Sequence, residues 1–163
     1  MIESDLVNEL FQSTLQNPNK LALAVHNNRL TYSELWQSIC ITSSNLDNLG
    51  INAGDRVLFS LDNTLDFIIL HFAIIKIGAI SVPIDTMISE TNLDSIIRNV
   101  SPALIFANKN WGKKLLINSE IFVDIASFFS SNDLDNQKVI ERYDYQRVAS
   151  QDLAVILFTS GST

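Results

Sequence analysis

The chain has 163 residues, of which 47% are hydrophobic and 18% are charged, and its formal net charge at pH 7 is -7. This length and composition predict a globular protein with about one domain's worth of chain and a sizeable core. The acidic balance, without a basic cluster, argues against nucleic acid as a partner. A single cysteine excludes an internal disulfide, and with only two histidines the chain offers no soft metal-ligand set.

The sequence also indicates where the protein resides. The first ten residues, MIESDLVNEL, have acids where a signal peptide would have lysines, so a cytoplasmic protein is expected. Residues 65–84, LDFIILHFAIIKIGAISVPI, are almost long and apolar enough to cross a membrane. Polar residues interrupt this segment, and Gly78 divides it into a helix and a strand, so no membrane span is expected.

The first elements are predicted to be a packing helix and a short hairpin. Ser4 can cap a helix that Asn17-Pro18-Asn19 ends. Its apolar face would comprise Leu6, Val7, Leu10, Phe11 and Leu15. Residues 21–26 and 29–32 then flank Asn27-Asn28, a dipeptide that tolerates the positive φ angles of a tight hairpin turn.

A second helix is predicted by the capping-box spacing of Thr31 and Glu34. It should begin near Tyr32 and run to Gly50, a residue suited to the position just after a helix. Its buried stripe is expected to comprise Leu35, Ile39, Leu46 and Leu49.

Strands and helices alternate in the next part of the chain. Strands are predicted over residues 56–61, 79–84 and 103–107. An apolar helix capped by Asp62-Asn63-Thr64 separates the first two, and a helix opened by the capping pair Thr91 and Asp94 separates the last two. This order predicts the α/β class, with a largely parallel sheet flanked by helices and joined by right-handed crossovers.

The signal weakens between residues 108 and 150. Short strands are predicted over residues 115–117 and 121–125, and a solvated connector over residues 133–151. Three single residues receive structural interpretations: Cys40 as a buried helix thiol, His71 as a satisfied core or surface histidine, and Asp85 as a turn former.

The last stretch, DLAVILFTSGST over residues 152–163, is the strongest functional signal. The apolar run 154–158 predicts a strand covered on both faces of the sheet, and its carboxyl end leads into Thr159, Ser160, Gly161, Ser162 and Thr163. Backbone N–H groups, hydroxyls and a glycine suit a phosphate-binding loop. A flexible tail remains the alternative for this stretch alone, and the motif is not a Walker A loop.

Three motifs resemble those of the adenylate-forming superfamily, which includes acyl-CoA synthetases, peptide-synthetase adenylation domains and luciferases. LAVILFTSGST, residues 153–163, is similar to the first half of that family's phosphate-loop signature. LTYSEL, residues 30–35, is similar to its L-T-Y-x-E-L motif, and KIGAISVPID, residues 76–85, to its K-x-G-A-x-x-V-P-[IL]-[DN] motif. The order and spacing agree, and the resemblance extends from about Leu21 to the last residue.

The resemblance implies that residues 1–163 are a partial N-terminal adenylation domain, an incomplete lobe that ends inside the phosphate-binding loop. Thr159 to Thr163 would bind the β- and γ-phosphates of ATP. The complete enzyme would use ATP and Mg²⁺, a carboxylic acid substrate, and the thiol of CoA or of a carrier protein. The family's magnesium-binding acid, ribose-binding aspartate and catalytic lysine lie further along, so no catalytic residue or metal ligand is expected here and the chain alone should be inactive.

Within the family, TMISETNLDSII over residues 86–97 lacks the tyrosine-proline and arginine typical of many amino-acid-activating domains, and it looks closer to acyl-CoA synthetases. Two other interpretations stay open. The chain could be a non-catalytic or vestigial interaction module of the same fold. A flavodoxin-like nucleotide-binding domain shares the α/β pattern, although no G-x-G-x-x-G follows an early strand.

Overall fold

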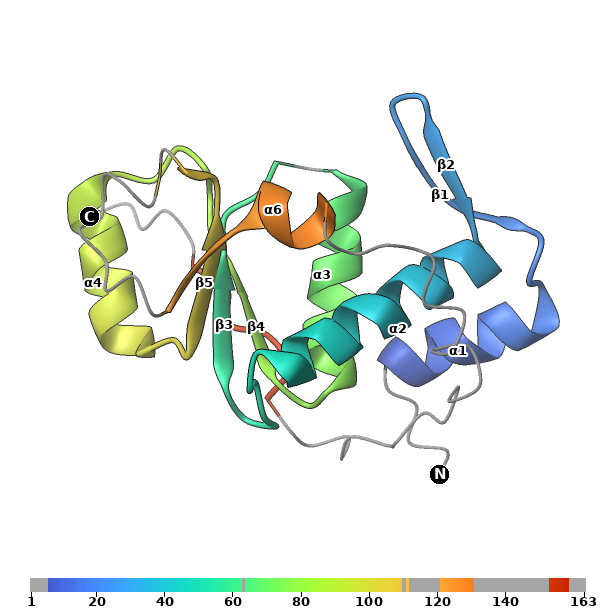
Figure 1. The fold of residues 1–163 in the computed structure, drawn as a ribbon, viewed down its shortest axis with the longest axis horizontal. Coiled ribbons are helices and arrows are strands. Elements are labelled where there is room, and N and C mark those ends of the chain that lie inside the picture. The colour runs from blue at the N-terminus through green and yellow to red at the C-terminus, as the bar shows by residue number, and fades with distance from the viewer. Residues whose placement is uncertain (1–5, 63, 110, 112–120, 131–152, 159–163) are drawn as a thin grey trace.

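The computed structural model describes residues 6–62, 64–109, 111, 121–130 and 153–158 (Figure 1). Its helices and strands follow the α/β order predicted from the sequence. In chain order they are α1 (Leu6–Gln16), β1 (Leu21–Val25), β2 (Asn28–Thr31), α2 (Tyr32–Asn48), β3 (Arg56–Phe59), α3 (Leu65–Lys76), β4 (Ile80–Pro83), α4 (Glu90–Val100), β5 (Leu104–Ala107), β6 (Phe122–Asp124) and α6 (Ile125–Ser130).

The main sheet is parallel and has the strand order β4-β3-β5-β6. From β3 the chain moves outward to β4, then crosses back to β5 on the other side of β3. Because right-handed crossovers in opposite directions place their helices on opposite faces, α3 and α4 lie on opposite sides of the sheet (Figure 1). The predicted fold class, a largely parallel sheet flanked by helices, is confirmed.

The core has one layer on each face of this sheet. Phe59 and Phe106 contribute to the layer shared with α2 and α3, whereas Leu58 and Ile105 contribute to the layer shared with α4. This alternation arises because successive side chains of a strand point to opposite faces. Strands β3 and β5 are therefore buried on both sides, which explains their short, continuously apolar sequences.

The capping box of α2 is formed as predicted. The Thr31 hydroxyl accepts from the Glu34 N–H at 3.3 Å, and the Glu34 carboxylate accepts from the Thr31 N–H at 2.8 Å. The hydrogen bond from the Thr31 N–H, followed by that from its hydroxyl, lowers the pKa of Glu34. Gly50 follows the helix with φ of +83°, in the left-handed region that favours glycine.

The membrane-length segment is divided as predicted. Thr64 caps α3, and Gly78 separates this helix from β4. The φ of Gly78 is +77°, which lies in the left-handed region that favours glycine, as at Gly50. Among the described residues, no helix is long and apolar enough to cross a bilayer.

Two predicted local features are wrong by one or two residues. The N-cap of α4 is Ser89, whose hydroxyl accepts from the Asn92 N–H, so Thr91 lies inside the helix. The hairpin pairs Val25 with Asn28, so the turn comprises His26 and Asn27, and His26 takes the positive φ of 54°.

The predicted apolar faces of the first two helices are too wide. Leu6 and Leu15 of α1 are 55% and 61% exposed, and Leu49 after α2 is 46% exposed. Helix α1 is an outer helix and is covered along a narrow stripe, in which Val7 and Thr14 are buried. Leu49 lies beyond the last turn of α2 as its C-cap residue.

The carboxyl-terminal part of the prediction is only partly covered by the structure. The strand predicted over residues 121–125 is present as β6, and the sequence does not predict α6, which follows it. The strand predicted over residues 115–117 and the connector over residues 133–151 lie outside the described residues.

Candidate functional site

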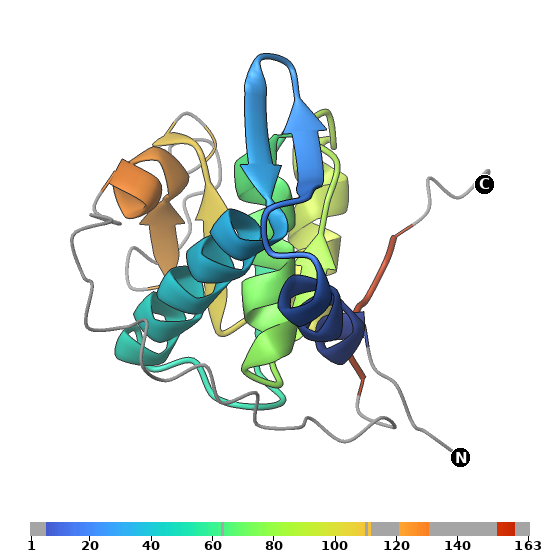
Figure 2. The same cartoon turned by 90° about the vertical axis from the view of Figure 1, so that its right-hand side faces the viewer.

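Residues 153–158 run beside β4 at the edge of the sheet, next to α1 (Figure 2). Val155 forms a parallel bridge with Ser81 of β4. The Ser81 N–H donates to the Ala154 carbonyl at 2.9 Å, and the Ile156 N–H donates to the Ser81 carbonyl at 3.0 Å. This segment is therefore the outermost neighbour of β4 in the described part of the sheet.

The prediction that residues 154–158 are covered on both faces is wrong for Leu157 and Phe158. Leu153, Leu157 and Phe158 are 57%, 71% and 42% exposed. The reason is its place at the edge, since within the described residues only β4 pairs with it and nothing covers its outer side. The apolar sequence of the segment does not by itself distinguish an edge strand from a central one.

The inner residues of the segment are held by packing on both faces of the sheet. Ala154 and Val155 contact a cluster that contains Val7, Trp36, Cys40 and Ile75. Ile156 instead packs with the layer under α4. The segment is therefore fixed in the middle, between its exposed ends.

Residues 153–158 run towards the carboxyl edge of the sheet. Because this segment runs parallel to β4, Phe158 lies towards the carboxyl edge of the sheet, where β4 ends. In open α/β sheets, ligands bind outside the carboxyl ends of the strands. The predicted site residues Thr159, Ser160, Gly161, Ser162 and Thr163 follow directly and lie outside the described residues, so their role stays a prediction.

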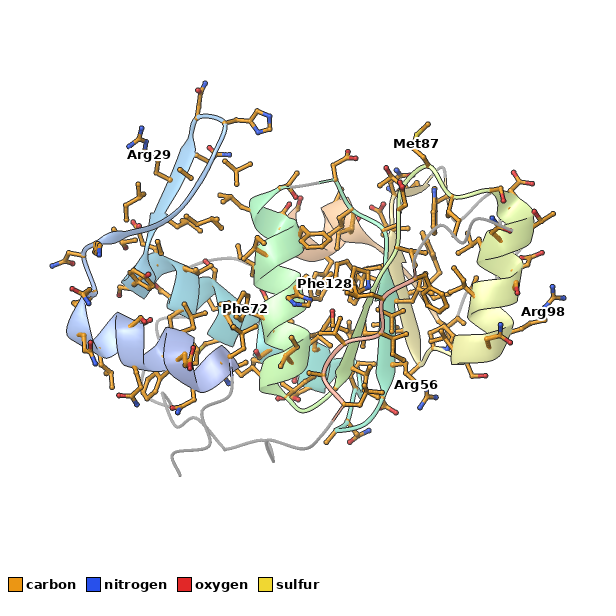
Figure 3. The ribbon with its side chains drawn as sticks, turned by 180° about the vertical axis from the view of Figure 1, so that it is seen from behind. Arg29, Arg56, Phe72, Met87, Arg98 and Phe128 are labelled. Carbon is orange, nitrogen blue, oxygen red and sulfur yellow. The ribbon has the colours of Figure 1, made fainter. Side chains whose placement is uncertain are left out.

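Polar side chains along the described carboxyl edge are mostly used to form turns. The Asp85 carboxylate accepts from the Met87 N–H at 2.8 Å, which agrees with its predicted role as a turn former. The Thr86 hydroxyl donates to Asp62 at 3.5 Å, joining the loops that follow β4 and β3. Figure 3 shows Met87 projecting from this edge, and the Met87 side chain is 86% exposed.

Arginine and lysine are distributed differently between the two ends of the sheet. Arg56 lies at the amino end, opposite Met87 (Figure 3), where its guanidinium donates to the carbonyls of Val100 and Ser101. At the carboxyl end, Lys109 lies 3.8 Å from the carboxylate of Asp124 and is 73% exposed. The Lys109 side chain is therefore accessible to an anion, whereas the Arg56 guanidinium is hydrogen-bonded to the backbone at the end of α4.

Asp124 is held mainly by the first turn of α6. Its carboxylate accepts from the Ser127 hydroxyl at 2.6 Å and from the Ser127 N–H at 3.1 Å. The Ser127 side-chain hydrogen bond is the largest of several causes that lower the pKa of Asp124, with Lys109 a smaller one. Because Lys109 is largely exposed, an ion pair of this kind adds little stability.

Ser60 is a buried polar residue that the sequence reasoning missed. It follows β3 and is only 4% exposed, and its hydroxyl has no hydrogen-bond partner in the structure as described. The signal was Ser60 itself, the single polar residue in the apolar stretch VLFSL, residues 57–61. Its N–H donates to the Phe106 carbonyl, so the backbone pairing of β3 with β5 continues through this residue.

His71 of α3 contacts the strand that receives the 153–158 segment. Its Nδ1 lies 2.7 Å from the hydroxyl of Ser81, which is fully buried. Burial lowers the pKa of His71 and so favours the neutral imidazole. The prediction of a satisfied core or surface histidine is confirmed, although the sequence did not indicate its partner.

The donor set for metals is sparse in the part of the chain that the structure describes. No group of three His, Cys, Asp or Glu side chains comes together there. Cys40 is buried on α2 as predicted, and burial raises the pKa of its thiol, which favours the uncharged form.

Comparison with known proteins gives both a family and relatives. Residues 10–163 match the family model described as AMP-binding enzyme. The chain is 31% identical over 153 residues to crotonobetaine/carnitine–CoA ligase of Escherichia fergusonii, which covers 83% of this chain and 29% of that ligase. It is 33% identical over 156 residues to a hybrid PKS-NRPS synthetase of Fusarium sp., covering 95% of this chain and 4% of that protein.

Solved structures share the fold. VinN superposes with a TM-score of 0.84 at 23% identity, over 97% of this chain and 42% of VinN. The N-terminal subdomain of NpsA from Klebsiella oxytoca, in complex with 3-hydroxyanthranilyl-AMSN, superposes with a TM-score of 0.79 at 19% identity, over 96% of this chain and 37% of that one. The chain thus spans less than a third of the curated relatives named above and less than half of these solved chains. Since the family model matches nearly the whole sequence, the chain belongs to the AMP-binding enzyme family, the adenylate-forming superfamily that its three motifs indicated.

Proposed function

We propose that this chain forms the N-terminal part of an ATP-dependent ligase that activates a carboxylic acid as an acyl-adenylate and passes the acyl group to a thiol. The observation that supports this most is the path of residues 153–158. They run parallel to β4 towards the carboxyl edge of the sheet, and TSGST follows them in sequence. Membership of the AMP-binding enzyme family supplies the reaction class.

In the proposed reaction, a carboxylate oxygen of the acid bonds to the α-phosphorus of ATP while the bond to the β-phosphate oxygen breaks. Pyrophosphate leaves with the negative charge. Backbone N–H groups and hydroxyls of Thr159 to Thr163 would stabilise that charge, since donors aimed at a developing anion lower the barrier. A thiol then attacks the acyl carbon, and AMP leaves.

Magnesium would neutralise phosphate charge in the complete enzyme. Among the described residues, no three Asp, Glu, His or Cys side chains come together in a group that could hold a metal ion. We therefore assign no magnesium ligand to them.

The acceptor thiol is proposed to be that of CoA or of a carrier protein. Relatives of both kinds are found, a CoA ligase and a hybrid PKS-NRPS synthetase. Comparing AMP release with CoA against AMP release with a phosphopantetheinyl carrier protein would decide between them.

ATP–pyrophosphate exchange tests the proposal. We expect the complete protein to incorporate labelled pyrophosphate into ATP only when a suitable carboxylic acid is present. Gly161→Val should abolish exchange because a side chain there would block close approach of the backbone to the phosphates, whereas Thr91→Ala on α4 should leave it unchanged. No exchange across a broad panel of acids would refute the ligase proposal.

The 163-residue chain alone is proposed to be inactive, because the matched relatives are far longer. Acid-dependent exchange by the chain alone would contradict this.

A second candidate is a non-catalytic interaction module, and the exposed apolar side chains of Leu153, Leu157 and Phe158 favour it. In that case the complete protein should show no exchange but should bind a partner through this edge.

A further inference from the structure

His71 and Ser81 form a polar contact inside an otherwise apolar layer. Ser81 lies in β4 between Ile80 and Val82 and has no exposed surface. A buried hydroxyl without a partner costs stability, and His71 of α3 provides that partner at 2.7 Å. The serine is therefore tied to the helix by its side chain as well as to the sheet by its backbone.

The imidazole of His71 is held by aromatic neighbours on its own helix. The Phe67 ring lies 6.3 Å away in a stacked arrangement with an interplanar angle of 17°. The Phe72 ring lies 5.8 Å away, edge-on at 84°. The imidazole thus contacts aromatic rings on α3 while its Nδ1 faces Ser81 of β4.

Ser81 is also the residue that receives the 153–158 segment. In the described residues, the two backbone hydrogen bonds that join this segment to the sheet both end on Ser81. Val155 bridges Ser81 and shares its face of the sheet. Val155 also packs in the same cluster as Phe72, which contacts His71 (Figure 3 shows Phe72 on α3).

We propose that His71 is a positioning residue, which acts through Ser81 to fix residues 153–158, the segment that precedes the predicted phosphate-binding residues in the sequence. The expected effect on catalysis with ATP rests on the proposed function, whereas the anchoring of residues 153–158 does not depend on it. The side-chain contact limits movement of Ser81, and the segment depends on Ser81 for its backbone bonds. Loosening this contact should let residues 153–158 shift relative to β4.

Amide hydrogen exchange of the complete protein tests the anchoring of residues 153–158. His71→Phe keeps the ring contacts and removes the polar atom, whereas His71→Asn places an amide near the position of Nδ1 and can keep the bond. We expect the Ile156 amide to exchange about tenfold faster in His71→Phe and close to wild type in His71→Asn. The Ile84 amide, which bonds to Phe59 on the other side of β4, should be unchanged in both variants. An unchanged Ile156 amide in His71→Phe would overturn the inference.

Kinetics of the complete protein separate positioning from a purely structural role. In ATP–pyrophosphate exchange, His71→Phe and Ser81→Ala should each lower kcat/KM for ATP by about 10- to 100-fold, with no further loss in the double variant. The double variant leaves neither polar atom unpaired, so its unfolding midpoint should stay near wild type although its activity stays low. Activity that recovers together with stability would mean a structural role and would overturn the inference. If the wild-type protein shows no ATP–pyrophosphate exchange, the proposed function fails. Protection of the Ile156 amide from hydrogen exchange then decides the anchoring alone.

Discussion

At the scale of single residues, protonation of His71 links pH to the stability of the sheet. Burial lowers the pKa of His71 below its ordinary value of 6.5 in the folded chain. Between that lower pKa and about pH 6.5, the unfolded chain binds the proton more readily than the folded chain does. The stability that the neutral imidazole contributes is therefore complete above about pH 6.5 and is lost as pH falls through this window.

We expect the urea midpoint of the wild-type chain to fall between about pH 7.5 and about pH 5, and to fall less in His71→Phe. Asp66, whose pKa is raised by burial, is present in both proteins, so their difference isolates His71. Equal pH dependence in the two proteins would contradict a partly buried His71 that is neutral in the folded chain.

Single-residue partners were beyond the reach of the sequence. Patterns of apolar spacing indicated that His71 was a satisfied core or surface residue, but its partner Ser81 is set by the packing of α3 on β4. Ser60 shows the same limit, because burial of its hydroxyl depends on the neighbours that the fold supplies. Thr159 to Thr163, the predicted site, are supported by their motif and by the direction of the strand before them.

At the scale of elements, the start of α4 gives a direct test of helix capping. Ser89 and Thr91 both carry hydroxyls, but only Ser89 has the extended N-cap conformation and accepts from the Asn92 N–H. We expect Ser89→Ala to lower the free energy of unfolding by about 1 kcal/mol. Thr91→Ala, within the helix, should change it by less than about 0.5 kcal/mol. Urea unfolding would measure both, and a larger loss in Thr91→Ala would restore the capping position predicted from the sequence.

Elements with two independent local signals were the ones that the sequence predicted well. The second helix had a capping box at Thr31 and a terminating Gly50, and both ends were correct. The predicted start of α4 was wrong because two hydroxyl residues compete for the N-cap. Thr91 is followed three residues later by Asp94, and Ser89, the observed N-cap, is followed three residues later by Asn92. Helix α6 has six residues and is held by contacts such as that of Phe128 with Phe106, at 4.8 Å between ring centroids. Such long-range packing leaves no local pattern.

At the scale of the whole molecule, the described sheet ends at β6 on one side and at residues 153–158 on the other. Figure 1 shows helices over both faces, but the 153–158 edge presents an exposed apolar row. Central strands were predictable from their apolar runs, whereas the order of strands was not, because an edge strand can have the same composition. The exposure of Leu153, Leu157 and Phe158 is therefore a finding of the structure.

An edge strand with exposed apolar side chains favours association between copies. We expect the 163-residue chain to self-associate at concentrations on the order of 100 μM, measured by sedimentation velocity. Leu157→Glu should reduce the association because it places a charge on the exposed row, where Leu157 is 71% exposed. Leu15→Glu is the matched control, since it makes the same change in charge at a 61% exposed leucine of α1 and should leave association unchanged. Equal effects of the two variants would mean that net charge, rather than this edge, governs the association.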